Sequence, residues 1–182
     1  MRAKGLSLVV VSLVAAFGMV LAVPASAASP KHPPLPPPPP MTGDAPGVAP
    51  AASVLLQGGG AGLPFINCIL AADSVHGSHH VNGTMNVTAR VGCNLAVPWL
   101  CIEAWIWSNN RQQYISDSGC VVFWPNKTGG TTNAPAPFCE TGWYIGLGYA
   151  DVIYPINYIP QERTLYVWST NGWTYITKGI DC

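Results

Sequence analysis

Charged side chains are scarce in this chain of 182 residues, where lysine, arginine, aspartate and glutamate together make up only 9%. Average soluble proteins contain about 25%. The eight basic and eight acidic residues give a formal net charge of zero, and the basic residues form no cluster. Because nucleic-acid-binding proteins neutralise phosphates with a basic patch, we expect no nucleic-acid partner.

Enzyme motifs are also missing. The sequence contains neither the Gly-x-Ser-x-Gly motif of hydrolases nor the His-Glu-x-x-His motif of zinc proteases. A glycosidase needs two carboxylates facing one cleft, and Glu103 is notable because it lies within an apolar run. Alternation along a strand instead places Glu103 on the solvent-facing side, together with Trp105 and Trp107. We therefore predict no enzymatic activity, no catalytic residue and no cofactor.

A histidine cluster is the only candidate for a metal site. His76, His79 and His80 lie close together in the sequence, and imidazole binds zinc, copper or nickel. No cysteine or carboxylate is placed to complete a site, since Asp73 is the nearest. The alternative is a polar loop at the domain edge, so we predict no metal.

The N-terminal residues have the three parts of a secretory signal peptide. Two basic residues precede an apolar run from Leu6 to about Val23, and Ala25-Ser26-Ala27 matches a signal peptidase site. The alternative is a membrane anchor, for which the run is short. We predict a signal peptide at 1–27, cleaved after Ala27, and a secreted, extracellular chain with no membrane span. That chain keeps six basic and eight acidic residues, a net charge of −2.

Residues 28–62 are rich in proline, alanine and glycine, which predicts a disordered linker. All but one of the residues in Pro33–Pro40 are proline. Proline fixes φ and lacks an amide donor, so this stretch favours an extended polyproline II helix of roughly 25 Å. It could be a ligand for an aromatic groove or a stiff spacer, and we favour the spacer.

Residues 63–182 are expected to form one domain of short strands. Met85–Cys93 alternates apolar and polar residues, and Leu100–Trp107 is almost continuously apolar. Turn signals separate these runs from later ones. The fold class is therefore all-β, an antiparallel β-sandwich. The later strands are expected at Gln113–Trp124 and Trp143–Tyr154, and in a last pair formed by Thr164–Thr170 and Gly172–Thr177.

All six cysteines lie in the predicted domain. An even number in an exported chain indicates three disulfides, and the absence of a Cys-x-x-Cys pair argues against metal binding. Six cysteines allow fifteen pairings, among which the sequence does not decide. The pairing we favour is Cys101–Cys120 across a hairpin, Cys93–Cys139 between sheets and Cys68–Cys182 joining the ends.

Three short motifs lie between about residues 82 and 160. The first is Cys93 before a hydrophobic strand that ends at Asn109-Asn110. The other two are Cys139-Glu140-Thr141-Gly142-Trp143-Tyr144 and Tyr154-Pro155-Ile156-Asn157-Tyr158-Ile159-Pro160. Together they resemble a family of small secreted actinobacterial proteins of uncharacterised function. The resemblance implies an immunoglobulin-like β-sandwich and brings no catalytic residues.

Aromatic residues are abundant, with seven tryptophans and seven tyrosines. A domain of this size cannot easily bury all of them, and exposed rings stack on sugars. The candidate ligand-binding residues are Trp105 and Trp107 on one strand face, with Trp168 and Trp173 flanking the last turn. The alternative is that they form the core and cross-strand pairs.

We therefore predict a non-enzymatic extracellular domain that acts as an interaction or structural module. Its partner is unknown, and an extracellular protein or a cell-wall polysaccharide would fit. One alternative is a carbohydrate-binding module that uses exposed tryptophan. Another is an inhibitor of extracellular proteases, with Pro125–Pro137 as a rigid exposed loop.

Overall fold

The computed structural model describes residues 34–41, 53–78 and 81–182. The predicted signal peptide, its cleavage site, His79 and His80 lie outside these residues. No helix within the described part of the chain is long and apolar enough to cross a membrane.

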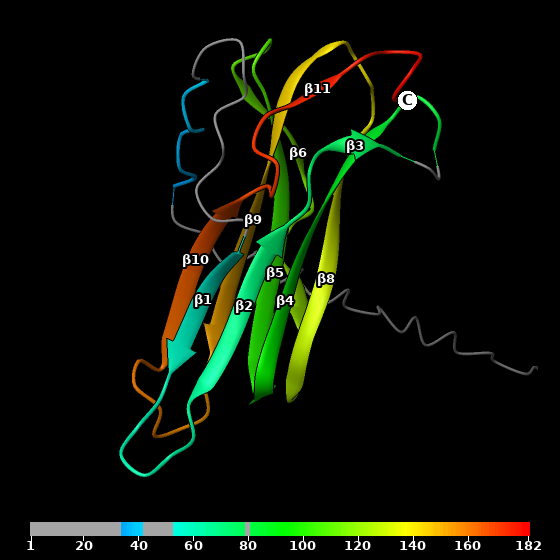
Figure 1. The fold of residues 1–182 in the computed structure, drawn as a ribbon. Coiled ribbons are helices and arrows are strands. Elements are labelled where there is room, and N and C mark those ends of the chain that lie inside the picture. Colours follow the sequence, from blue (N-terminus) through cyan, green and yellow to red (C-terminus); the bar gives the residue numbers. More distant parts are fainter. Residues whose placement is uncertain (1–33, 42–52, 79–80) are drawn as a thin grey trace, which may run out of the picture.

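The described residues form two antiparallel sheets (Figure 1). In the five-stranded sheet, β2 and β3 pair one edge of β4 in succession, β1 pairs β2, and β8 pairs β4. Its strands are β1 (Ser53–Gly58), β2 (Ile66–Ala72), β3 (His76–Gly77), β4 (Met85–Val97) and β8 (Lys127–Ala136). In the six-stranded sheet, β5 and β9 pair at the centre. Its strands are β5 (Trp99–Ser108), β6 (Gln113–Asp117), β7 (Val121–Phe123), β9 (Gly142–Ile153), β10 (Glu162–Trp168) and β11 (Thr174–Ile176).

The main core lies between the two sheets. Side chains alternate along a strand, and β5 turns its even-numbered residues inward, with Leu100, Ile102 and Ile106 fully buried. From the other sheet, Leu70 and Val87 join the same apolar cluster. The predicted all-β antiparallel sandwich is therefore confirmed. The odd-numbered residues of β5 face outward on the other side of their sheet.

Two strand predictions and the predicted linker need correction. Gln113–Trp124 forms two strands instead of one, because the chain turns at Gly119, whose φ of 64° suits glycine. The last two strands do not form a hairpin with each other, since β10 and β11 pair successive stretches of β9. The predicted linker 28–62 is also wrong in part, because its residues Ser53–Gly58 form β1 and pair with β2.

The disulfide Cys101–Cys120 is confirmed, and the other two predicted pairings are wrong. Cys68 and Cys93 are direct partners across β2 and β4, with Cα atoms 4.0 Å apart, and they bond to each other. Cys139 then pairs with Cys182. Three disulfides are typical of proteins from an oxidising extracellular environment.

The loop proposed for protease inhibition does not exist as a loop. Most of Pro125–Pro137 is β8, which pairs with β4 from Met85↔Ala136 to Gly92↔Gly129. Its backbone is held in a sheet, so it cannot be presented to a protease as a free, extended loop.

Candidate functional site

The outward side of the six-stranded sheet carries a continuous set of aromatic side chains, here called the aromatic face. Strand alternation brings them together, because Trp105 lies opposite Leu147, and Tyr149 lies between Glu103 and Tyr166 on the neighbouring strands. The aromatic face consists of Trp99, Trp105, Trp107, Tyr114, Tyr149, Tyr166 and Trp168.

Close ring contacts hold the aromatic face together. Trp105 meets Tyr149 edge-on with ring centroids 6.1 Å apart, and Tyr149 lies 5.0 Å from Tyr166. Trp107 and Tyr114 form a T-shaped pair at 5.0 Å. Each such pair contributes about 0.5–1.5 kcal/mol beyond its burial, so the rings form a rigid surface.

The proline-rich segment 34–41, drawn in blue in Figure 1, lies against this surface. Leu35 packs beside Trp105 and Tyr114. The Tyr114 hydroxyl donates a hydrogen bond to the Pro36 carbonyl at 2.8 Å. The indole Nε1–H of Trp173 donates to the Pro39 carbonyl at 3.2 Å. The segment is therefore docked on the domain and does not act only as a spacer.

Burial along this segment repeats every third residue. Pro34, Pro37 and Pro40 are exposed, and the residues between them and after Pro40 are half-buried. A polyproline II helix has three residues per turn. This periodicity indicates that the segment is a polyproline II helix that presents one side to solvent and the rest to the domain.

The candidate tryptophans are less exposed than the carbohydrate hypothesis requires. Trp105 and Trp107 share one face as predicted, but Trp105 is only 2% exposed and Trp173 only 3%. Trp107 and Trp168 are half-buried. The prediction of an exposed tryptophan surface is therefore wrong for Trp105 and Trp173, because neighbouring rings and the proline-rich segment cover this side of the sheet.

Buried carboxyl side chains lie within the aromatic face, between Trp99 and Trp105 along β5. Glu103 and Asp151 are 3% and 8% exposed, so the expected solvent exposure of Glu103 is wrong. Burial, followed by the neighbouring Glu162 and Glu103, raises the pKa of Asp151 to about 7. The Asp151 Oδ1 atom is buried without a hydrogen-bond partner. This part of the face is therefore acidic and tightly packed.

Burial also keeps the tyrosine donors protonated. It is the main cause that raises the pKa of Tyr114, and the neighbouring Tyr166 adds to it. The Tyr114 hydroxyl therefore retains its proton at any physiological pH and remains a donor to Pro36. Sequence reasoning missed Tyr114, although a proline run together with many aromatic residues was the signal available.

Of the three histidines considered for a metal site, His76 is described, and His79 and His80 lie outside the described residues. The His76 Nδ1 atom lies 3.0 Å from the Ser74 carbonyl oxygen. Within the part of the chain that the structure describes, the one group with metal-like spacing is Cys101, Glu103 and Cys120. Both cysteines are consumed by a disulfide, so this group offers no thiolate.

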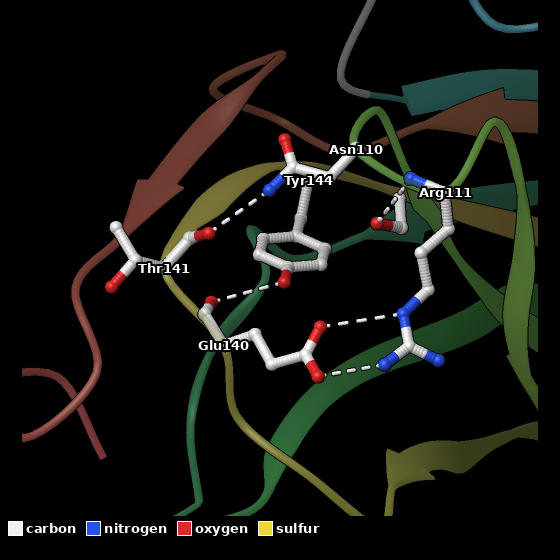
Figure 2. Close-up of polar contacts among 6 residues, drawn as sticks. Asn110, Arg111, Glu140, Thr141 and Tyr144 are labelled. Carbon is white, nitrogen blue, oxygen red and sulfur yellow. Dashed lines mark hydrogen bonds and ion pairs between the residues drawn. The ribbon is translucent and has the colours of Figure 1, made fainter.

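The motif Cys139–Tyr144 has a structural role (Figure 2). Arg111 makes a two-pronged ion pair with Glu140, at 2.7 and 3.3 Å, and lies over the Phe138 ring. The Tyr144 hydroxyl donates to the Glu140 carbonyl, and the Asn110 amide donates to the Thr141 carbonyl. These contacts fix the loop before β9 to the β5–β6 turn.

Comparison of the chain with protein-family models, with curated proteins and with solved structures gave no match. The family resemblance and the immunoglobulin-like topology that it implies therefore stay predictions.

Proposed function

We propose that this chain is a secreted, non-enzymatic interaction module that recognises proline-rich chains through its aromatic face. The observation that carries the proposal is the docked segment 34–41, with its three-residue burial period and its two carbonyls bound by Tyr114 and Trp173. The chain's own segment supports proline-rich chains as the ligand, because a segment of that chemistry already fits the face.

The chemistry of polyproline explains this choice of side chains. A proline-rich chain has no amide donors, so its carbonyl oxygens are its main polar groups. A receptor must supply donors on an apolar surface, and Tyr and Trp combine a ring with one O–H or N–H. Because polyproline II is already extended before binding, it loses little conformational entropy.

The segment also competes for the face within the same chain. A tethered ligand acts at an effective concentration in the millimolar range. A partner's proline-rich chain would have to displace it, so binding by the intact chain is expected to be weaker than binding by a chain whose segment has been loosened. The segment thereby limits access to the face.

The test supplies the ligand separately. We would measure fluorescence anisotropy of a labelled Pro33–Met41 peptide with oxidised protein from Ala28 onward. A Pro36→Gly, Pro39→Gly variant loosens the bound side of the segment and should gain saturable binding. The matched control, Pro37→Gly with Pro40→Gly, changes two exposed prolines and makes the segment flexible to the same degree. It should gain less peptide binding than the first variant.

Absence of binding by the Pro36→Gly, Pro39→Gly variant, with its circular dichroism unchanged, would overturn the proposal and leave the segment as a structural strap. Pull-down of the same variant by cell-wall polysaccharide, without peptide binding, would instead favour the carbohydrate alternative.

A further inference from the structure

Two loops form an apolar tip at one end of the sandwich, defined by Leu63, Phe65, Ile156 and Ile159. Their exposed fractions are 37%, 61%, 82% and 79%. One loop connects β1 to β2 and the other connects β9 to β10. Figure 1 shows both loops side by side, at the end of the molecule away from the C-terminus.

The tip is free of charge as well as apolar. Neither residues 58–66 nor residues 152–161 contain a lysine, arginine, aspartate or glutamate. Exposed isoleucines scattered singly need no explanation, but a contiguous apolar group does.

Hydrogen bonds lock the two loops to each other. The Ile159 amide donates to the Gly59 carbonyl at 2.8 Å, and the Gly59 amide donates back to Ile159 at 3.3 Å. The Tyr158 hydroxyl donates to the Pro64 carbonyl at 3.0 Å. Within each loop, the Leu63 amide donates to Gly60 and the Tyr158 amide to Pro155.

These hydrogen bonds lower the cost of moving the tip from water into lipid. A backbone polar group without a partner costs several kcal/mol in hydrocarbon. Because the loops pair several of their amides and carbonyls internally, fewer polar groups of the tip lose hydrogen bonds on leaving water than in an unpaired loop. The aromatic ring of Phe65 also lies directly on the backbone of Gly59, where an added Cβ would be 2.6 Å from the ring.

The size of the tip favours lipid over a protein partner. Four partly exposed side chains offer on the order of 400 Å² of apolar surface, about half of the roughly 800 Å² per partner in a stable protein interface. Binding at a membrane interface scales with the apolar area that enters the headgroup boundary and does not need a partner surface of fixed size. The absence of basic residues removes any preference for anionic lipid.

We propose that the apolar tip inserts into the interfacial region of a lipid membrane and binds zwitterionic lipid. The long axis of the sandwich would then point away from the membrane, with the aromatic face in water. This inference does not depend on the proposed recognition of proline-rich chains.

The test is flotation of the oxidised chain from Ala28 onward with phosphatidylcholine vesicles. The unaltered chain should float with the vesicles, and 0.5 M salt should not release it. Ile156→Ser with Ile159→Ser should weaken binding about tenfold or more, because two inserted side chains are lost. The matched control, Val81→Ser with Ile180→Ser, changes residues that are 58% and 81% exposed elsewhere and should bind as before.

Failure of the unaltered chain to float, or equal loss in the control, would overturn the proposal. So would concentration-dependent dimerisation in sedimentation velocity that Ile156→Ser with Ile159→Ser abolishes, because the tip would then bind a second copy of this chain.

Discussion

The outward sides of the two sheets differ in the side chains that they carry and in what covers them. On the five-stranded sheet, most outward residues of β4 and β8 are polar, and Thr88 donates to Asn133 at 2.7 Å while Arg90 pairs with Asp73. On the six-stranded sheet, the outward residues are aromatic and a proline-rich segment lies over them. The outward side of the five-stranded sheet is exposed to solvent, and that of the six-stranded sheet is covered by the segment 34–41.

This contrast shows why the segment docks where it does. An apolar face of this extent left in water would attract another molecule. A proline-rich chain suits such a cover because its carbonyls need only the donors that Tyr114 and Trp173 provide. On the proposed function, the same face binds a separate proline-rich chain when the chain's own segment is displaced.

The largest effect should come from removing the ring at the centre of the covered face. Trp105→Ala deletes a side chain that is 2% exposed and should lower the free energy of unfolding by about 3–5 kcal/mol. The matched change on the other face, Ile69→Ala, alters a residue that is 53% exposed and should cost about 0.5 kcal/mol or less. Urea unfolding measures both, and similar losses would mean that the faces do not differ in burial.

The second effect is a dependence of stability on pH that belongs to the covered face alone. The pKa of Asp151 is raised to about 7 from 3.8 by burial, then by Glu162 and Glu103. The folded state therefore holds this proton more tightly than the unfolded state. The contribution of this carboxyl group to stability should be largest below about pH 4 and fall as the pH rises to 7. The loss should be smaller than the roughly 4 kcal/mol of the full shift, because solvent screens part of the charge.

Asp151→Asn should remove most of that slope and raise stability at pH 8, in urea unfolding between pH 4 and 8. Asp73→Asn, on the polar face, should leave the slope in place. A slope that survives Asp151→Asn would show that Asp151 does not cause it.

A smaller effect tests the hydrogen bond that holds the cover. Tyr114→Phe keeps the ring but removes the donor to the Pro36 carbonyl, which should cost about 0.5–1.5 kcal/mol. The loosened segment should also make tryptophan fluorescence easier to quench with acrylamide. Tyr175→Phe, at a residue that is 50% exposed, is the matched control and should change neither measurement. No change in Tyr114→Phe would mean that ring packing alone holds the segment.

Much of the fold could be predicted from local sequence patterns. The alternation in Met85–Cys93 and the apolar run of Leu100–Trp107 identify β4 and β5. In both strands the pattern of apolar residues reflects which side chains are buried. β8 was missed because its sequence, Lys127–Ala136, contains three threonines, two glycines and a proline, and alanine is its only apolar side chain besides that proline. β8 is a strand because it pairs with β4, and its own residues do not indicate a strand.

The site was predicted only in its parts. Alternation placed Trp105 and Trp107 on one face, and the proline run was recognised as a polyproline II helix. Their meeting depends on contacts far apart in sequence, such as Tyr114 with Pro36, which no local pattern encodes. The disulfides show the same limit, since only Cys101–Cys120 spans a hairpin that the sequence itself suggests.

The smallest change in the free energy of unfolding is expected on the outward side of the five-stranded sheet. Asn133→Ala removes the acceptor of the Thr88 hydroxyl, and both side chains lie at the surface. Water can replace the lost partner, so the free energy of unfolding should change by about 0.5 kcal/mol or less. Urea unfolding beside Tyr114→Phe measures the difference between the faces directly. A loss as large as that of Tyr114→Phe would show that the Thr88–Asn133 bond is shielded from water, and the polar face would then also need a cover.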